Sequence, residues 1–423
     1  MKKKVFIPLA ITAAIVVAGA SLVTAIVLKK PGKIDGFDKA VTSLSEIEIP
    51  EGTRIVALGE ATHGNKEFQE LKLELFQKLV EKNDIRALVL EGEAGGCAIA
   101  NRYIQGGEGS AEEATKHLGY RLYRTDQMCE LVQWMHDYNE TAAEGDKVRL
   151  YGMDIQRHTD SVAYLTETYE SLDPLKAQDY SSRMENVIGT EDYEYASVDL
   201  NKATSLMDEI LADLKDHSAE YEEKIGKTAL SDAEYSAESI KSCMEYYLKD
   251  QATHKARDSR MKENVDRILK LEEDEYKSEI MMSCHNGHMT QIQANQVNFL
   301  GTFLNETYGE SYFAIGTDYY KTTVNLPSES GRTNVQLDSG DPLAYQVKKL
   351  DGNEYYLDFS KVDKSSKLGQ TVSSPLWMGS VGEANSPLYK VSKAFRSIYN
   401  TPSELYDAMV LYYEVTPTEI WDD

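Results

Sequence analysis

Five short apolar runs, separated for the most part by amphipathic segments, narrow the possible folds of this sequence more than any other feature. Each run is rich in aliphatic residues and is bounded by polar residues or glycine, as buried strands are. The runs are Arg54–Glu60, Arg86–Glu93, Val148–Asp154, Ser278–His285 and Ser311–Asp318. Strands that alternate with helices predict parallel βαβ units. We therefore expect an α/β fold, a three-layer α/β/α sandwich with a mostly parallel sheet.

The segments between these strands carry helical periodicity. Helices are expected over about 65–81, 95–105, 111–118 and 126–140. From about 159 to 276 the sequence is helical and highly charged, with no strand pattern. This stretch predicts a large helical insertion between the third and fourth strands. Later in the chain, the pattern favours a strand at Tyr355–Ser360 and a helix at Ser403–Tyr413.

The N-terminus predicts attachment to a membrane. After Met-Lys-Lys-Lys come 24 residues without a charge, Val5–Leu28, followed by two lysines. As a helix this segment is about 36 Å long, enough to cross a bilayer. An uncleaved signal anchor and a signal peptide cleaved near Ala18–Ala20 both stay open. We expect residues 1–33 to be anchor and linker and the rest to lie outside the cytoplasm, as part of a single-pass membrane protein or secreted.

The net charge limits the macromolecules that the chain can bind, and the cysteine content limits the metal sites that it can form. The first 33 residues carry six lysines and no acid, so the remaining chain holds 39 basic and 70 acidic residues. A surface this acidic repels nucleic acid, and no nucleic-acid partner is expected. The four cysteines form no C-x-x-C pair, which argues against a zinc ribbon. They are predicted to be free and mostly buried.

Polar residues gather at the predicted strand ends, where parallel sheets bind ligands. They are Glu60 and His63 after the first strand, Glu91 at the end of the second, Asp154 at the end of the third, and His285 and His288 after the fourth. Singly, each has a structural alternative such as a helix cap or a polar turn. Together they are expected at one edge of one sheet, which indicates an enzyme.

The same residues narrow the chemistry. The sequence has no G-x-S-x-G, P-loop or G-x-G-x-x-G motif, which argues against a serine hydrolase and against a nucleotide-binding enzyme. His285 and His288 could supply two metal ligands, but H-E-x-x-H is absent and no metal is expected. Cys284 precedes His285 in the predicted strand, so its side chain is expected in the core rather than in the site. A histidine–glutamate set without a serine fits hydrolysis of a carbonyl by activated water, with a second histidine or an arginine on the oxyanion.

Five ordered motifs, GEATHG-x-x-E, ALVLEGE, YGMDIQ, ARDSRMKENV and HNGHM, resemble the erythromycin esterase family. They span roughly residues 50–320. The resemblance implies that residues 34–423 form a catalytic domain that hydrolyses a small-molecule ester or lactone, including macrolide-like substrates, without metal or cofactor.

The resemblance also implies individual roles. His63 is then the general base, with Glu60 as its carboxylate neighbour. Glu91 and His285 complete the catalytic set, and the residues assigned to substrate binding are Glu67, Asp154, Arg257 and His288. For Arg257 the alternative is a surface salt bridge. An extracellular cell-envelope protein of the same fold, which binds or modifies a surface glycan or another envelope molecule, is the alternative function. The oligomeric state is left open.

Overall fold

The structure is a computed structural model that describes residues 31–421 apart from 196–197, 249–253, 294–296 and 330. The predicted anchor, within residues 1–30, lies outside the described residues. Among those that are described, no helix is both long and apolar enough to cross a membrane.

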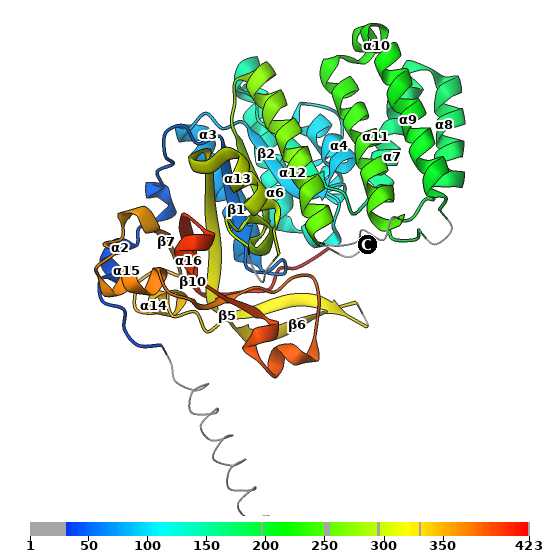
Figure 1. The fold of residues 1–423 in the computed structure, drawn as a ribbon. Helices are drawn as coiled ribbons and strands as arrows, with labels where there is room; N and C mark the ends of the chain where they lie inside the picture. Colours follow the sequence, from blue (N-terminus) through cyan, green and yellow to red (C-terminus); the bar gives the residue numbers. More distant parts are fainter. Residues whose placement is uncertain (1–30, 196–197, 249–253, 294–296, 330, 422–423) are drawn as a thin grey trace, which may run out of the picture.

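A mostly parallel sheet forms the middle of the molecule (Figure 1), with strand order β3-β2-β4-β1-β5-β10-β7. The five predicted strands are confirmed as β1 (Ile55–Glu60), β2 (Ala87–Glu93), β3 (Arg149–Asp154), β4 (Ile280–His285) and β5 (Tyr312–Ser328). Two further strands run antiparallel to their neighbours, namely β6 (Gly331–Asp338) on β5 and β7 (Glu354–Asp358) on β10 (Ala408–Val415). The sheet is therefore mostly parallel, as expected.

Helices cover both faces of the sheet. One face carries α3 (Lys66–Lys82), α4 (Ala94–Ile104), α5 (Ala111–Lys116) and α6 (Asp126–Thr141), and the other carries α12 (His254–Leu271) and α13 (Leu300–Tyr308). Successive strand side chains point to opposite faces. Val56 and Leu58 of β1 accordingly pack in one apolar core, and Ile55 and Ala57 pack in the other. The two cores confirm the three-layer sandwich.

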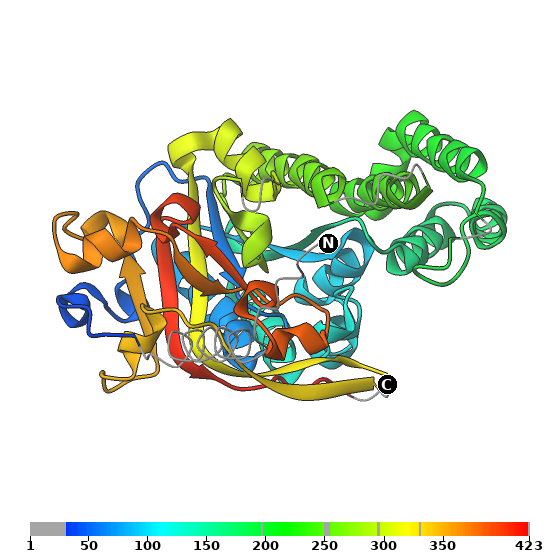
Figure 2. The same cartoon turned by 60° about the horizontal axis from the view of Figure 1, so that its bottom comes forward.

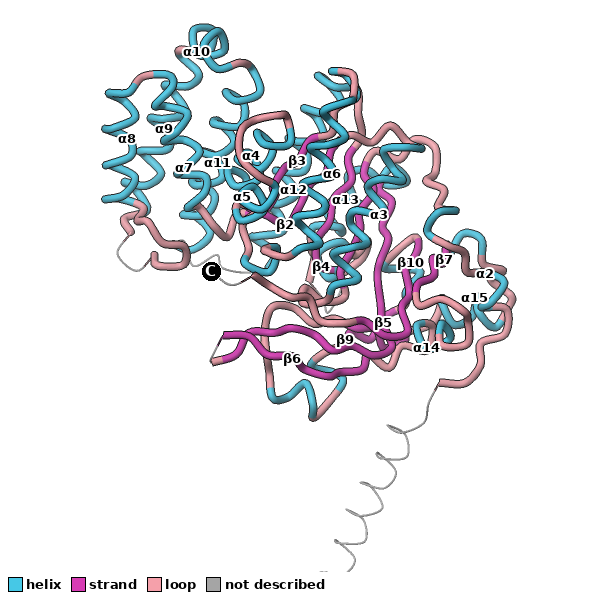
Figure 3. The backbone as a smooth tube through the Cα atoms, turned by 180° about the vertical axis from the view of Figure 1, so that it is seen from behind, coloured by secondary structure: helices cyan, strands magenta, loops and turns pink. Residues whose placement is uncertain are grey.

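The helices between β3 and β4 extend the domain to one side, as Figure 3 shows from behind. They are α7 (Thr159–Leu172), α8 (Pro174–Val187), α9 (Leu200–Asp216), α10 (Ser218–Ile225), α11 (Lys227–Leu248) and α12. The first five pack around an apolar core of their own, which includes Tyr164, Leu206 and Ile240. Helix α12 returns to the sheet, where Val265 joins the core beneath it. The last helix of the insertion thus packs against the sheet.

The predicted helix at Ser403–Tyr413 is wrong. The structure has a short helix, α16 (Pro402–Leu405), followed by strand β10 (Ala408–Val415) between β5 and β7. Val410 and Leu411 belong to different cores and are both fully buried. A strand buried on both faces shows no alternation of apolar and polar residues, so periodicity does not separate it from a helix.

A two-stranded arm, residues 376–400, lies between β7 and β10 in sequence and was not predicted. It comprises β8 (Leu376–Gly379), the short 3-10 helices η8 (Pro387–Lys390) and η9 (Lys393–Phe395), and β9 (Ser397–Asn400). The Val381 N–H donates to the Ala61 carbonyl at 2.9 Å. This bond joins the arm to the loop that carries His63.

All four cysteines are free, as predicted. Cys97, Cys243 and Cys284 are buried, and Cys129 is partly exposed. Cys284 packs in the core behind the sheet.

Candidate active site

A cavity of about 390 Å³ opens at the carboxyl ends of β1, β2 and β4. Among its lining residues are His63, Glu91, Arg257, His285 and His288. The convergence expected at the strand ends is therefore present for His63, Glu91, His285 and His288, and Arg257 joins them from α12. Glu60 and Asp154 lie behind the cavity wall, and Glu67 lies elsewhere.

Two polar residues hold the histidine-bearing loops at fixed positions. Asn286 Nδ2 donates to the Thr317 carbonyl at 2.7 Å, and the Thr317 N–H returns a bond to Asn286 Oδ1 at 3.2 Å. Thr317 Oγ1 donates to the Gly59 carbonyl and accepts from the Ala61 N–H. A Cβ atom on Gly59 would lie 2.1 Å from Asn286 Oδ1, so only glycine fits there. The loops after β1 and β4 are thus locked together through β5.

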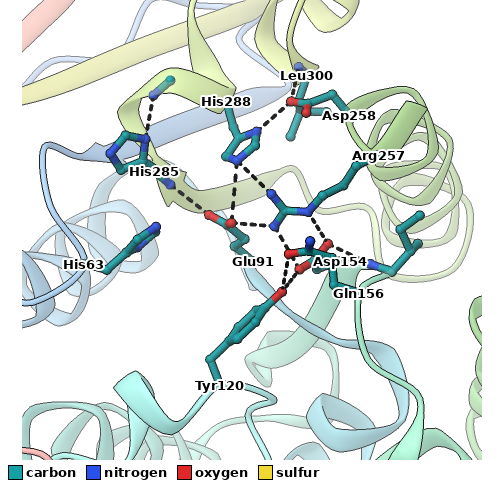
Figure 4. Close-up of polar contacts among 12 residues, drawn as sticks. His63, Glu91, Tyr120, Asp154, Gln156, Arg257, Asp258, His285, His288 and Leu300 are labelled. Atoms are coloured by element: carbon teal, nitrogen blue, oxygen red, sulfur yellow. Dashed lines mark hydrogen bonds and ion pairs between the residues drawn. The ribbon is translucent and has the colours of Figure 1, made fainter. Parts of the chain in front are cut away.

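Arg257 is the centre of the polar network in Figure 4. Its Nε donates to Asp154 Oδ1 at 2.8 Å, and its Nη2 donates to Asp154 Oδ2 and to Glu91 Oε1 at 2.8 and 2.6 Å. Its Nη1 lies 2.9 Å from His288 Nε2. On the other side of the ring, His288 Nδ1 lies 2.7 Å from Asp258 Oδ1. Arg257 is buried, which excludes the surface salt bridge.

Asp154 supports the site from behind instead of facing the cavity. Besides Arg257, it accepts hydrogen bonds from the Tyr120 hydroxyl and the Ile155 N–H. Tyr120 lines the cavity and also lies 3.0 Å from Gln156 Oε1. Burial is the main cause, and the negative charge of Asp154 the second, that raises the pKa of Tyr120 well above its usual value. The phenol therefore stays protonated. Asp154 therefore positions Arg257 and Tyr120. It lies behind the cavity wall and not at the cavity, so its location does not fit the predicted role in direct substrate binding.

His285 faces the cavity with one unused N–H. Its backbone N–H donates to Glu91 Oε2 at 2.9 Å, and its Nδ1 accepts from the Gly287 N–H at 3.2 Å. The proton of the neutral ring is therefore on Nε2, which is buried and has no hydrogen-bond partner. Burial, and then the nearby His63 and His288, lower the pKa of His285 to about 3. The ring stays neutral at pH 7, and its Nε2–H is available to an oxygen atom of a substrate.

His63 lies beside His285, with 5.0 Å between the ring centroids, and both rings flank the Glu91 carboxylate (Figure 4). Behind His63, the buried Glu60 places Oε1 3.9 Å from His63 Nδ1. The same oxygen, Glu60 Oε1, lies 3.0 Å from the ammonium of Lys72, which is also fully buried. Below, the line from Lys72 to His63 means this set of His63 at the cavity and Glu60 and Lys72 buried behind it.

The charges along this line set the protonation states. Burial alone lowers the pKa of His63, but the carboxylates of Glu60 and Glu91 outweigh it and raise the pKa above its usual 6.5. Burial alone raises the pKa of Glu60, but Lys72 and His63 outweigh it and bring the pKa below 4.5. Glu60 is therefore ionised and favours a proton on His63 Nδ1, which leaves Nε2 as the basic nitrogen.

Glu91 is ionised as well. Burial alone raises its pKa, but His288, Arg257 and His63 outweigh burial and hold the pKa well below the usual value. Its two oxygens contact Arg257 and the backbone of His285, so the carboxylate fixes both residues at the cavity.

Glu67 does not line the cavity, contrary to its predicted role. Its carboxylate accepts from the Thr416 N–H at 2.8 and 3.0 Å and from the Thr416 hydroxyl at 2.7 Å. Glu67 lies in the first turn of α3, and these bonds tie that turn to the segment after β10. Its carboxylate is therefore engaged away from the catalytic edge.

Sequence analysis did not identify Lys72 as a residue of the site, although the sequence contains a signal for it. On α3 it lies four residues after Phe68 and four before Phe76, both buried, so it interrupts the apolar stripe of the helix. A charged residue on such a stripe is almost never buried without a partner. The pattern therefore pointed to a buried acid, which is Glu60.

The remaining cavity wall comes from distant segments that the motifs do not include. Tyr246 is contributed by α11, and Phe299 precedes α13. The arm contributes Ser380, Glu383 and Ile398. These residues share no spacing in sequence, so no pattern identifies them.

The histidine nitrogens of the site are largely committed. Both ring nitrogens of His288 are engaged, as is Nδ1 of His285. Within the described ranges, the group of His, Cys, Asp and Glu side chains close enough to hold a metal ion is His136, Asp137 and Glu140 on α6. None of these three lines the cavity.

Comparison with known families and proteins gives a consistent result. The family model for erythromycin esterase matches residues 80–415. A putative hydrolase of Bacillus subtilis (strain 168), YbfO, is 24% identical over 373 residues, which are 79% of this chain and 81% of that protein. Erythromycin esterase type II of Escherichia coli is 31% identical over 106 residues, which are 25% of this chain and 24% of that protein.

Solved structures share the fold. A succinoglycan biosynthesis protein superposes with a TM-score of 0.72 at 18% identity, covering 91% of this chain and 97% of its own. A Bacillus cereus protein gives 0.71 at 22% identity, covering 93% and 96%. A mutant of the erythromycin esterase EreC in its open conformation gives 0.62 at 19% identity, covering 88% and 93%.

Proposed function

The chain belongs to the erythromycin esterase family, which implies a hydrolase, and we propose that it hydrolyses an ester or lactone with water activated by His63. The observation that supports this most is the pair of unlike imidazoles in one cavity. His63 has a carboxylate behind it and a raised pKa, and His285 is neutral with an unused N–H. A base for water and a donor for the oxyanion are what carbonyl hydrolysis needs.

The proposed reaction follows from these two nitrogens. A water molecule bound to His63 Nε2 attacks the carbonyl carbon while His63 takes its proton. The carbonyl oxygen becomes an oxyanion that accepts a hydrogen bond from His285 Nε2. The carbon–oxygen bond to the leaving group then breaks, and the His63 imidazolium returns the proton to the departing alkoxide. An ester and water give an acid and an alcohol, and a lactone gives one hydroxy acid.

The buried residues support this cycle. Glu60 stabilises the imidazolium that forms on His63, and Lys72 keeps Glu60 ionised. Glu91 holds the backbone of His285 in place, and Arg257 donates to His288. Arg257 and His288 line the cavity and are proposed to contact the substrate.

No metal takes part in the proposed reaction. The nitrogens of His288 and Nδ1 of His285 are used by protein donors and acceptors, and the water can be activated by His63 alone. This part of the proposal also agrees with the family resemblance.

A substrate screen tests the proposal. The purified protein is assayed against esters and lactones, including macrolides, in isotopically labelled water, before and after dialysis against a strong chelator. We expect label in the carboxyl product and an unchanged rate after chelation. Loss of activity that zinc or manganese restores would show that the histidines act as metal ligands.

We propose further that the uncharged segment Val5–Leu28 holds the domain outside the cell membrane. The support is the length of the segment and the lysines at both of its ends. Protease added to intact cells should degrade the protein. Complete protection until the cells are lysed would contradict this topology.

A further inference from the structure

Exposed apolar side chains gather on the arm. Among the described residues, seven large hydrophobic side chains are exposed, and four of them lie between residues 388 and 399. They are Leu388 (44% exposed), Val391 (76%), Phe395 (51%) and Tyr399 (58%). Single exposed apolar residues are common, but a group of them on one segment marks an interaction surface.

The arm is firmly attached, so this exposure is part of the fold. Arg396 and Tyr389 are buried beneath it. Arg396 Nε donates to the Asp338 carbonyl at 2.9 Å, and Nη1 donates to the Tyr389 carbonyl. Ser380 N–H donates to the Arg396 carbonyl at 3.0 Å. The apolar side chains are thus held outward by a segment that is bound to β6.

The same stretch is basic in an acidic protein. Residues 384–403 contain Lys390, Lys393 and Arg396 and no acidic residue, whereas the whole chain has 70 acidic and 45 basic residues. Lys390 is exposed between the exposed Leu388 and Val391. Exposed apolar side chains interleaved with lysine are typical of surfaces that lie on anionic bilayers.

The arm lies in the part of the domain where the described chain begins. In Figure 1 the blue start of the described chain and the orange-red segment 387–395 both lie in the lower part of the domain, and in Figure 2, which brings this part forward, the blue start lies to the left of that segment. The sequence before this start contains the uncharged segment Val5–Leu28. A domain tethered through that segment turns this part toward the lipid.

We propose that the exposed face of the arm, formed by Leu388, Lys390, Val391, Phe395 and Tyr399, docks on the surface of an anionic lipid bilayer. A second copy of the chain fits this face less well. Within the part of the chain that the structure describes, the other exposed large apolar residues, Leu175, Tyr193 and Ile292, are scattered, so an apolar partner surface there would have to be another arm. Two arms in contact would bring their exposed Lys390 side chains together, and like charges repel each other.

Docking would place the cavity near the lipid headgroups. Gly382, Glu383 and Ile398 of the arm line the cavity, so one side of the cavity wall and the docking face belong to the same segment. The docking itself does not require the proposed hydrolysis, and its test uses no activity measurement.

The test uses full-length protein reconstituted in vesicles that contain anionic lipid. A polarity-sensitive fluorophore is attached to Val391→Cys in a Cys129→Ser background, because Cys129 is the one native thiol that is not buried. The matched control carries the label at Leu175→Cys, an apolar residue of α8 that is 80% exposed. Lipids with a quencher at the headgroup level report contact with the bilayer.

We expect emission from position 391 to shift to shorter wavelength and to be quenched by the labelled lipid, with neither effect at position 175. Lys390→Gln should lower the equilibrium constant for contact about fivefold, the effect of one lysine at an anionic surface. Equal, water-like emission at both positions would overturn the proposal. A shift at position 391 that persists in detergent, depends on protein concentration and resists the lipid quencher would overturn it in favour of a second copy.

Discussion

Replacing Lys72 tests how the candidate base is held in place. The Lys72 ammonium is fully buried and lies 3.0 Å from Glu60 Oε1, and Glu60 Oε1 lies 3.9 Å from His63 Nδ1. Lys72→Met retains most of the side-chain volume and leaves the buried Glu60 charge with His63 alone. Removal of one partner from a buried ion pair costs about 3–5 kcal/mol. We expect the free energy of unfolding at pH 7 to fall by this amount.

Chemical denaturation measures that loss, and Lys78→Met is the matched control. Lys78 lies on the same helix, and its ammonium is 3.6 Å from Glu81 in a pair that is open to solvent. Surface pairs contribute about 0–1 kcal/mol, so the control should lose little. The folded-state pKa of Glu60 is lowered, so the contribution of the ion pair is present above the unfolded pKa and is lost as the pH falls through the folded pKa. The difference between the two variants should therefore shrink in acid.

Two further results follow for Lys72→Met. Without the ammonium, the Glu60 carboxylate is paired with His63 alone and stabilises the His63 imidazolium more strongly, so the rise of the hydrolysis rate with pH should move to higher pH. Adding Glu60→Gln removes the unpaired charge and should restore part of the stability without restoring the rate. Equal losses in Lys72→Met and Lys78→Met, or no recovery in the double variant, would refute the line from Lys72 to His63.

Other variants test the rest of the network. Arg257→Lys keeps the charge but cannot reproduce the hydrogen bonds to Asp154, Glu91 and His288. Each charged hydrogen bond that is lost costs about 1.5–3 kcal/mol, so we expect a lower melting temperature and at least a tenfold loss of rate. Full activity would contradict a role of Arg257 in the site. Burial and, second to it, the nearby Asp341 raise the pKa of the buried Asp318 well above its usual value. The stability that Asp318 contributes is therefore present in acid and is lost as the pH rises through its folded-state pKa. Melting temperatures from pH 5 to 8 should decline less in Asp318→Asn than in the parent protein, and identical slopes would exclude this carboxyl pair as the cause.

The strands of the parallel core could be predicted because each is a short apolar run with clear ends. β10 could not, because the run AMVLYYEV is buried on both faces and lacks the alternation that separates strand from helix. The arm could not either, because its strands have only four residues each and its place depends on bonds to distant residues such as Ala61 and Asp338.

The candidate site was predictable to the extent that strand topology determines it. Parallel strands bring their carboxyl ends together, so His63, Glu91 and His285 could be expected in one place. Side-chain direction was not predictable from the motifs. Glu67 belongs to the first motif, yet it reaches Thr416 from the first turn of α3, and Asp154 lies behind Arg257. These outcomes depend on neighbours that are 349 and 103 residues away in sequence.

The central claim, that His63 is the general base, is tested most directly by His63→Asn in the hydrolysis of a confirmed substrate. Asparagine keeps polarity and approximate size but cannot accept the proton from water, and loss of a general base typically lowers the rate about 10²–10⁴-fold. His136→Asn is the control, since His136 is a partly exposed histidine of α6 outside the cavity. We expect kcat/KM to fall by that factor in His63→Asn, with an unchanged melting temperature, and to stay near the parent value in His136→Asn. If His63→Asn retains more than about a tenth of the parent rate, His63 is not the base.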